Sequence, residues 1–233
     1  MHALKFNLKG KTAFFKNPEV NSYFYFTYGN IHKPALLGMF GAILGLNGYE
    51  AGYVDFPEYY KVLRDIKISV VPSSFNGYFP KKIQHFNNSV GYASQEQGGN
   101  LIIKEQWLEN SSWIIYVALI DEIGEKLADM LLENRCIYMP YLGKNDHPAT
   151  IGDTLLTELK EIGKAERLHS LAPADMMEFD WDEAGFKYEE YLPIALKPST
   201  NLYEMQKFIL TDAILESANK PVYSDGEKNI VFY

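Results

Sequence analysis

The chain has 233 residues, of which 47% are hydrophobic and 15% aromatic, so it can bury a substantial core in one large domain or two small ones. A single cysteine, Cys136, excludes an internal disulfide and a cysteine-based zinc site, and it fits a reducing cytoplasm. The net charge of −8 is uneven, because residues 1–105 carry a balance of +4 and residues 106–233 carry −12. This asymmetry suggests one face for a polyanion and another for a different partner, although ordinary solvated surface explains the same numbers.

The first third of the chain predicts a strand, an extended segment and a helix. Residues 3–9 alternate between apolar and polar side chains, which is typical of a strand with one buried and one basic face. A loop is expected over residues 10–18 and a second extended segment over residues 22–28. Pro34 suits the first turn of a helix that runs to about Leu46 and ends on a left-handed cap at Asn47-Gly48.

The middle of the chain predicts a projecting arm. Residues 58–65 suggest a short helix, and residues 66–71 form a strand by composition that Pro72 ends. Residues 73–100 are rich in Asn, Gln, Ser and Gly, with interleaved aromatic residues, and are too long for an ordinary turn. We therefore expect an extended hairpin or mobile arm, a thumb, that leaves the core.

The next elements predict a hairpin, a helix and a strand. Two strands over residues 100–107 and 113–119 would be joined by a turn at residues 109–112. A helix is expected from its cap at Asp121 to about Glu133, followed by a strand over residues 137–144.

This order of elements is strand, helix, strand, strand, helix, strand, the split βαβ pattern. We predict an α+β protein with a ferredoxin-like, RNA-recognition-like domain over residues 1–151, a protruding thumb over residues 73–100 and a smaller β-rich extension over residues 152–233. In the extension we expect a helix over residues 153–161 and strands over residues 191–196, 208–215 and 229–233.

Four glycines of the predicted first helix share one stripe. Gly38, Gly41, Gly45 and Gly48 are spaced by three, four and three residues. Each glycine inside a helix costs roughly 1 kcal/mol relative to alanine. Tight packing and close approach of a ligand backbone explain the stripe equally well. The helix N-terminus with Lys33 is a candidate anion site.

Basic residues alternate with aromatic residues in two places. Lys9, Lys11 and Lys16 flank Phe14 and Phe15, a pattern that suits single-stranded RNA because lysines follow phosphates and rings stack on bases. The projecting arm repeats this pattern with Lys81, Lys82 and His85 among aromatic residues. A solvated loop over a buried Phe pair is the alternative for the first cluster.

Other chemical signatures are absent from the sequence. No HExxH, GxSxG, Walker or dinucleotide pattern is present, and we expect neither a cofactor nor a metal. Asp180, Asp182 and Glu183 are better explained as an exposed acidic turn than as metal ligands. No signal-peptide pattern is found, and the longest apolar stretch, residues 35–46, is shorter than the roughly 20 residues of a membrane-spanning helix.

Several stretches of the first 151 residues resemble a known family. They are residues 13–18 (AFFKNP), 33–45 (KPALLGMFGAILG), 104–108 (KEQWL), 113–119 (WIIYVAL) and 138–144 (YMPYLGK). In this order they resemble CRISPR-associated protein family five of the RAMP superfamily, and the last stretch is similar to its PYLG turn.

The resemblance implies a cytoplasmic subunit of Cascade, the type I CRISPR surveillance complex, and is nearest to subtype I-B. Such subunits use a thumb to grip the 5′ handle of the CRISPR RNA and cap the backbone filament, and the guide then pairs with target DNA. The expected partners are CRISPR RNA, the backbone subunit, the large subunit and, through the complex, target DNA, with no membrane.

The resemblance also implies roles for individual residues. Lysines near the first strand and helix would contact handle phosphates, glycines would allow close approach, and the thumb would hook over the RNA or lie against the backbone subunit. The predicted RNA-binding residues are Lys9, Lys11, Phe15, Lys16, His32, Lys33, Gly38, Gly41, Lys81, Lys82, His85 and Lys104.

An enzyme is the alternative. One branch of the family, in type I-C systems, cuts precursor RNA with a Tyr, Lys and His set, for which Tyr49, Lys104 and His85 are the candidates here. No histidine is adjacent to Lys104, so we expect a non-catalytic subunit. A metal-independent endoribonuclease and an interaction module without RNA contact stay open.

Overall fold

The computed structural model describes residues 1–20, 24–49, 55–89, 91–92, 95–163 and 165–233. Its helices are α1 (Lys33–Leu44), α2 (Glu58–Leu63), α3 (Glu122–Leu132) and the short 3₁₀ helix η2 (Ala174–Met176). The strands are β1 (His2–Ala13), β2 (Phe24–Tyr25), β3 (Ile68–Pro72), β4 (Lys81–Asn87), β5 (Ile102–Ala118), β6 (Thr150–Glu158), β7 (Lys160–Ile162), β8 (Ala172–Pro173), β9 (Met177–Asp180), β10 (Lys187–Leu196), β11 (Tyr203–Thr211), β12 (Ile214–Ala218), β13 (Val222–Ser224) and β14 (Asn229–Val231). None of the described helices is long and apolar enough to cross a membrane.

The main sheet has the expected split βαβ order. Strands β3, β5, β1 and β6 lie side by side, and each pairs antiparallel with its neighbour. The connections β1–α1–β3 and β5–α3–β6 supply the two helices of this pattern. The pattern therefore closes on β6, not on a strand at residues 137–144. The division expected after residue 151 falls inside β6.

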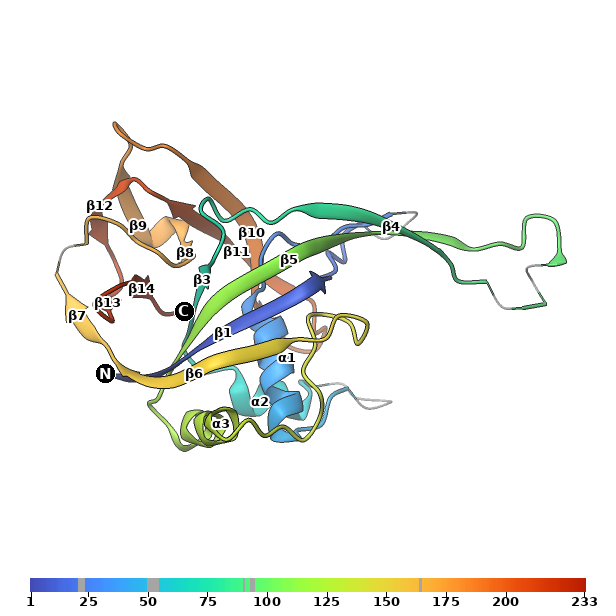
Figure 1. Cartoon of the computed structure of the whole chain (residues 1–233), viewed down its shortest axis with the longest axis horizontal. Coiled ribbons are helices and arrows are strands. Elements are labelled where there is room, and N and C mark those ends of the chain that lie inside the picture. Colours follow the sequence, from blue (N-terminus) through green and yellow to red (C-terminus); the bar gives the residue numbers. More distant parts are fainter. Residues whose placement is uncertain (21–23, 50–54, 90, 93–94, 164) are drawn as a thin grey trace.

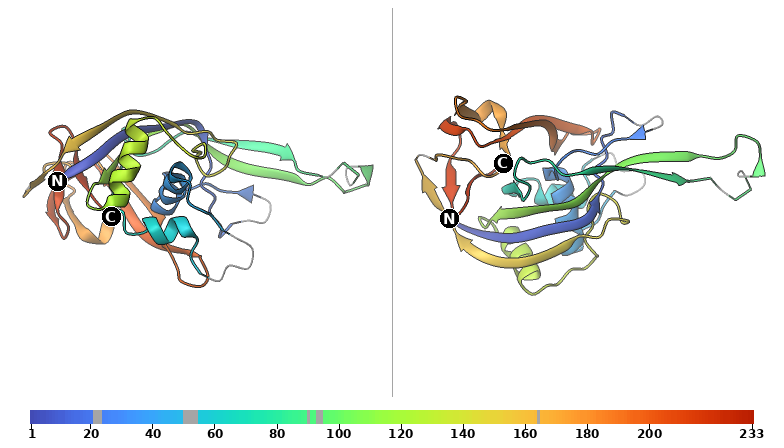
Figure 2. Two further views of the ribbon diagram at one scale, coloured as in Figure 1. Left: turned by 90° about the horizontal axis from the view of Figure 1, so that it is seen from below. Right: turned by 45° about the horizontal axis from the view of Figure 1, so that its top comes forward.

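The helices cover one face of this sheet (Figures 1 and 2). Alternation along β1 turns Leu4, Phe6 and Leu8 toward them, and all three are fully buried. Phe6 packs edge to face on Phe40 of α1, with ring centroids 6.4 Å apart. The polar side chains of β1 consequently lie on the opposite face of the sheet.

The projecting thumb is confirmed, and its strands are β4 and the first half of β5 (Figures 1 and 2). The turn expected at residues 109–112 is wrong, because β5 is a single strand of 17 residues. Here β5 continues its pairing with β1, with Gly10 opposite Ser111 and Thr12 opposite Glu109. Asn110 takes a φ of 49° within this run. Pairing across the sheet thus overrides a local turn composition.

Residues 137–144 form a loop along the end of α1. The main-chain N–H groups of Ile137 and Tyr138 donate to the carbonyl oxygens of Ile43 and Ala42, at 3.0 Å each. They satisfy carbonyl groups that the end of a helix leaves free. The helix itself ends at Leu44, earlier than predicted, and Gly45 is its left-handed cap with a φ of 76°.

The C-terminal part consists of small sheets, β10-β11-β8, β9-β12 and β14-β13-β7, at one end of the main sheet (Figure 1). The helix expected over residues 153–161 is wrong, because these residues belong to β6 and β7. The strands expected at residues 191–196 and 229–233 correspond to β10 and β14, and the segment 208–215 covers the end of β11 and the start of β12.

A buried ion pair ties the β13–β14 turn to the outer face of the main sheet. The Asp225 carboxylate accepts from Lys5 Nζ and from Tyr116 Oη, each at 2.7 Å, and its side chain is 3% exposed. Burial alone would raise the pKa of Asp225, but hydrogen bonds from Lys5, Tyr116 and the main chain of Lys228 and Glu227 hold it below its usual range. The carboxylate is therefore charged in the folded protein.

Candidate nucleic-acid interface

A hollow of about 1000 Å³ lies between α1, the 138–144 loop and the root of the thumb. Six tyrosines are prominent among its described lining, and the charged members are Lys16, Lys144 and Glu105. The tyrosines are Tyr25, Tyr49, Tyr59, Tyr138, Tyr141 and Tyr203. A concave surface with many rings and two ammonium groups suits bases and phosphates of a single strand.

The YMPYLGK loop forms one wall because a glycine lets it pack on the residue that follows β1. Gly143 takes a φ of 89°, and a Cβ there would overlap the main-chain oxygen of Phe14. Phe14 N donates to Leu142 O at 3.1 Å, and Leu142 is fully buried. The loop therefore presents Tyr138 and Tyr141, which are 60% and 45% exposed, from a packed and hydrogen-bonded base.

Lys144 directly follows this glycine and is held by a buried carboxylate. Its Nζ lies 3.1 Å from Glu105 Oε2 and 3.2 Å from Oε1, and Glu105 is 5% exposed. Trp107 Nε1 donates to the same carboxylate at 2.8 Å. Lys144 is not among the site residues predicted from the sequence, although its place directly after the PYLG turn is a usable signal.

Lys16 is the predicted lysine that reaches the hollow. It is exposed, and its Nζ lies 4.0 Å above the ring centre of Tyr25. Tyr25 belongs to β2, which pairs with the thumb root at Glu105. An ammonium group above a tyrosine ring at the root of the thumb can bind a phosphate, while the ring stays available for stacking on a base.

His32 and Phe15 belong to the hydrophobic core at the base of the hollow. Phe15 is 2% exposed and packs edge to face on Trp113 and His32, which favours the alternative of a buried Phe pair over stacking on RNA. His32 caps α1, where its Nδ1 accepts from Ala35 N at 3.3 Å. Burial lowers the pKa of His32 to about 3, so the ring is neutral at physiological pH and cannot serve as a cation.

The anion site expected at the N-terminus of α1 is also corrected. Lys33 is 7% exposed, and its Nζ donates to the main-chain oxygen of Tyr233 at 3.3 Å. Its ammonium is thus directed to Tyr233, beyond the end of β14, and Lys33 does not line the hollow.

The glycine stripe serves several purposes. A Cβ at Gly41 would lie 2.5 Å from Tyr59 Cβ, so this glycine permits α2 to pack on α1, as the packing alternative expects. A Cβ at Gly38 would meet nothing nearer than Tyr59 Cε2 at 4.0 Å, and Gly38 lines the hollow. Gly45 is the helix cap and Gly48 lies beyond the helix.

The remaining predicted lysines lie on other surfaces. Lys9 and Lys11 are exposed on β1, on the face of the sheet opposite the helices, and Lys11 is in the strand, not in a loop. They are thus separated from Lys16, which lines the hollow.

The thumb presents its basic residues on two faces. Lys81 and His85 alternate with Lys82 along β4, and His85 pairs directly with Lys104 of β5. Lys81, His85 and Lys104 are exposed, whereas Lys82 lies 3.5 Å from Glu109. The cluster expected in the arm is therefore divided.

The alternative catalytic set is only partly assembled. Lys104 and His85 face the same side of the thumb, whereas Tyr49 lines the hollow, where neither of the other two residues takes part. Within the described residues, no group of three or more His, Cys, Asp or Glu side chains is placed to hold a metal ion.

Comparisons with known proteins identify the fold. No family model and no curated protein sequence matches the chain. A CRISPR protein from Archaeoglobus fulgidus matches 99% of this chain and 98% of its own, with a TM-score of 0.55 and 9% identity. A chain of a CRISPR RNA-guided surveillance complex matches 91% of each chain, with a TM-score of 0.53 and 12% identity.

A third neighbour belongs to a type III-B Cmr-beta complex bound to cognate target RNA and AMPPnP. It matches 92% of this chain and 86% of its own, with a TM-score of 0.50 and 10% identity. At identities this low, the structural matches establish the architecture alone. It is a mixed α/β fold with a large sheet and several small ones. The chain has the fold of CRISPR-associated proteins.

Proposed function

We propose that this protein is a non-catalytic subunit of a type I CRISPR Cascade complex that binds and caps the 5′ handle of the CRISPR RNA. The observation that carries the proposal is the tyrosine-lined hollow with Lys16 and Lys144 at the root of a projecting thumb. The structural similarity to CRISPR-associated proteins supports the same proposal.

The hollow has the chemistry that a single strand of RNA requires. Lys16 supplies positive charge for a phosphate, and Lys144, whose ammonium Glu105 and Asp146 pair at 3.1 and 3.4 Å, adds a hydrogen-bond donor. The exposed Tyr49, Tyr138 and Tyr141 supply rings for bases. Burial raises the pKa of Tyr59 and of Tyr203, so both hydroxyls stay protonated and can donate hydrogen bonds.

The thumb and the acidic part of the chain would serve assembly. The exposed face with Lys81, His85 and Lys104 would hook over the RNA or lie against the backbone subunit. The acidic second half would meet the large subunit, and the guide would read target DNA by base pairing. Subtype I-B is the assignment that the sequence resemblance favours.

A competing proposal is a metal-independent endoribonuclease that uses Tyr49, Lys104 and His85. The separation of Tyr49 from the other two residues favours the binding role. Purified protein is incubated with repeat RNA in EDTA, and we expect no specific cleavage. Site-specific cleavage that disappears in Lys104→Ala would overturn the non-catalytic assignment.

The RNA role is tested by charge reversal in the hollow. Lys16→Glu should weaken binding of an RNA that carries the repeat-derived 5′ end by about tenfold at fixed salt, since one phosphate contact is replaced by repulsion. The matched control is Lys160→Glu on β7, an exposed lysine of the C-terminal part. Filter binding over a salt series measures the RNA affinity of both variants. Equal losses of affinity in the two variants would mean that the hollow is not a specific RNA site.

A further inference from the structure

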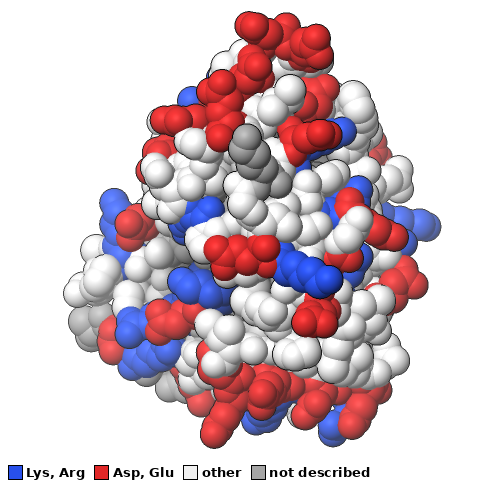
Figure 3. All heavy atoms as spheres, turned by 90° about the vertical axis from the view of Figure 1, so that its left-hand side faces the viewer, with Lys and Arg blue, Asp and Glu red and all other residues white. Residues whose placement is uncertain are grey.

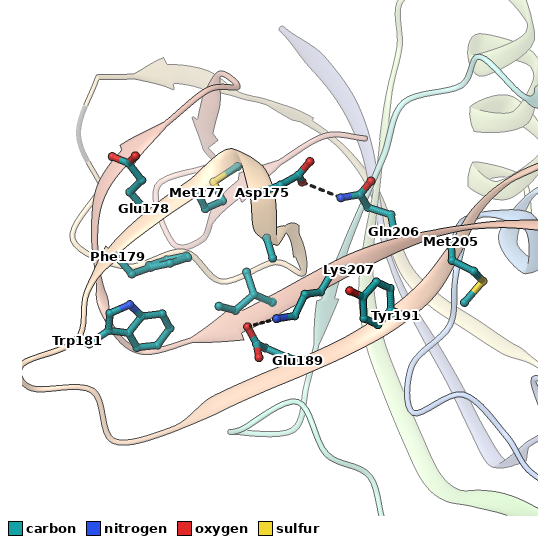
Figure 4. A pocket seen from close by; sticks show the side chains of 12 residues that line it. Asp175, Met177, Glu178, Phe179, Trp181, Glu189, Tyr191, Met205, Gln206 and Lys207 are labelled. Carbon is teal, nitrogen blue, oxygen red and sulfur yellow. Dashed lines mark hydrogen bonds and ion pairs between the residues drawn. The ribbon is translucent and has the colours of Figure 1, made fainter.

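A second concave surface lies in the C-terminal part, between β9 and the β10–β11 hairpin (Figure 4). We call it the acidic groove, and its volume is about 690 Å³. Its described lining comes from η2, β9, β10 and β11. The side chains drawn in Figure 4 include Asp175, Met177, Glu178, Phe179, Trp181, Glu189, Tyr191, Met205, Gln206 and Lys207.

The groove forms because the two faces of the β10–β11 hairpin have different surroundings. Leu192 and Phe208 point into the main core, where each is 1% exposed. Their neighbours Tyr191 and Lys207, which pair across the hairpin, turn to the other face and line the groove. This second face is only partly covered by the β9–β12 pair.

The floor of the groove is apolar and its walls are aromatic. Met177, Phe179 and Ile209 are 7%, 9% and 4% exposed and belong to one core cluster. Trp181 and Tyr191 form part of the walls and are 42% and 61% exposed. Exposed large rings around an apolar floor are typical of surfaces that bind other chains.

The rim of the groove is acidic and partly unpaired. Residues 174–191 contain seven acidic residues and one lysine. Asp175 accepts from Gln206 Nε2, and Glu178 accepts from Ser217 Oγ, each at 2.7 Å. Among the described residues neither carboxylate has a lysine or arginine within ion-pair distance, whereas Glu189 is shared by Lys187 and Lys207.

The C-terminal end of the molecule is acidic beyond the groove. In Figure 3 acidic side chains gather at the top of the face, over the turns of the C-terminal sheets, and separately at the bottom, over α3, with lysine and arginine side chains among acidic ones between the two clusters. Nucleic acid is repelled by such a surface, and a basic chain is attracted to it.

We propose that the acidic groove is a docking site for an extended, basic segment of a partner protein. Arginine or lysine side chains would pair with Asp175 and Glu178, beside Trp181, whose ring already carries the Lys187 ammonium at 4.6 Å. Intervening apolar side chains would enter toward Phe179. Strand β9 pairs with β12 along one edge and, within the part of the chain that the structure describes, with no strand along the other, which suits a segment added as a strand. The assignment concerns protein contacts and does not depend on the RNA role of the hollow.

The test uses the full chain and three synthetic ten-residue peptides. The probes alternate Arg with Leu, Glu with Leu, and Arg with Ser. Fluorescence anisotropy of the labelled peptides measures affinity, and the indole N–H signals in a ¹H–¹⁵N spectrum locate binding. The chain has three tryptophans, of which Trp107 and Trp113 lie outside the groove lining.

We expect the Arg-Leu peptide to bind most tightly and to shift the indole signal of Trp181 alone. The double variant Asp175→Asn, Glu178→Gln should weaken this binding by about fivefold to tenfold, since two charge pairs are lost. The matched control is Glu122→Gln, Glu125→Gln, which removes the same charge from the exposed side of α3. Equal weakening in both double variants, equal binding of the Glu-Leu peptide, or an unmoved Trp181 signal would overturn the proposal.

Discussion

Two concave surfaces of opposite character share the strand β11. Tyr203 lines the hollow beside α1, and Met205 and Lys207 of the same strand line the acidic groove. The hollow combines tyrosines with two lysines and one buried carboxylate, whereas the groove combines aromatic residues with an acidic rim. Aromatic walls alone therefore say little about the ligand, and it is the surrounding charge that separates a nucleic-acid surface from a protein surface.

The two surfaces also differ in how they are supported. The hollow depends on one loop whose position is fixed by Gly143, while the groove depends on two strands that share a core. Each can thus be disturbed separately.

The largest effect is expected for Gly143→Ala. A Cβ at this position overlaps the Phe14 carbonyl, and the φ of 89° is strained for alanine, so the free energy of unfolding should fall by about 3 kcal/mol. Urea denaturation measures the loss. RNA binding at the hollow should weaken under native conditions, while binding of the Arg-Leu peptide to the groove persists.

Gly48→Ala is the control for this change, since a Cβ at Gly48 meets nothing within 4 Å. A loss of stability as large in Gly48→Ala as in Gly143→Ala would show that the loop is not held at residue 143.

A smaller effect is expected for Asp225→Asn, which loosens the C-terminal part from the main sheet. The pKa of Asp225 is held below its usual value, so its contribution to stability is present above the unfolded pKa of about 3.9 and is lost as the pH falls through both values. The variant should lose about 2 kcal/mol at neutral pH, and its difference from the wild type should close in acid.

Urea denaturation at neutral pH and at several acidic pH values measures this convergence. Asp182→Asn, at an exposed acidic residue beside the groove, is the matched control and should change stability little at any pH. A gap that stays constant into strong acid would mean that the Asp225 charge contributes nothing.

The sequence predicted the framework of the hollow better than its contents. Alternation in β1, the proline at the start of α1 and the Asp121 cap of α3 are local signals, and the structure confirms each. Which side chains enter the hollow depends on packing across the sheet. Lys33 and Phe15 are adjacent to the right elements but turn into the core, whereas Lys144 is exposed to the hollow because Glu105 lies opposite.

The acidic groove could not be predicted in the same way. Both faces of the β10–β11 hairpin carry apolar residues, since Leu192 lies in the main core and Ile209 in the second cluster. The alternation that would mark a surface strand is therefore weak. Trp181 and Tyr191 line one groove only because of the turn between β9 and β10, for which the sequence offers no local rule.

A matched pair of glycines separates packing from ligand approach in α1. Gly41→Ala should lower the free energy of unfolding by about 1 kcal/mol, because its Cβ would lie 2.5 Å from Tyr59 Cβ and displace α2. Gly38→Ala has room, at 4.0 Å, and should raise stability by up to about 1 kcal/mol through helix propensity.

RNA binding by the same two variants tests the function of the stripe. If the RNA backbone approaches α1, Gly38→Ala should weaken binding severalfold although it stabilises the fold. Unchanged RNA affinity in Gly38→Ala would make Gly38 a residue without a ligand role.

The smallest effect is expected for removal of the acidic rim on RNA binding at the hollow. Charges separated by more than a Debye length of about 8 Å are largely screened at physiological salt, so Asp175→Asn with Glu178→Gln should change RNA affinity by less than about twofold there. At low salt the screening length increases, and the variant should bind RNA more tightly than the wild type because repulsion from the rim is removed. A large gain at physiological salt would instead place the RNA path across the groove. The distinction between a nucleic-acid surface and a protein surface on β11 would then be wrong, because the acidic rim would be acting directly on bound RNA.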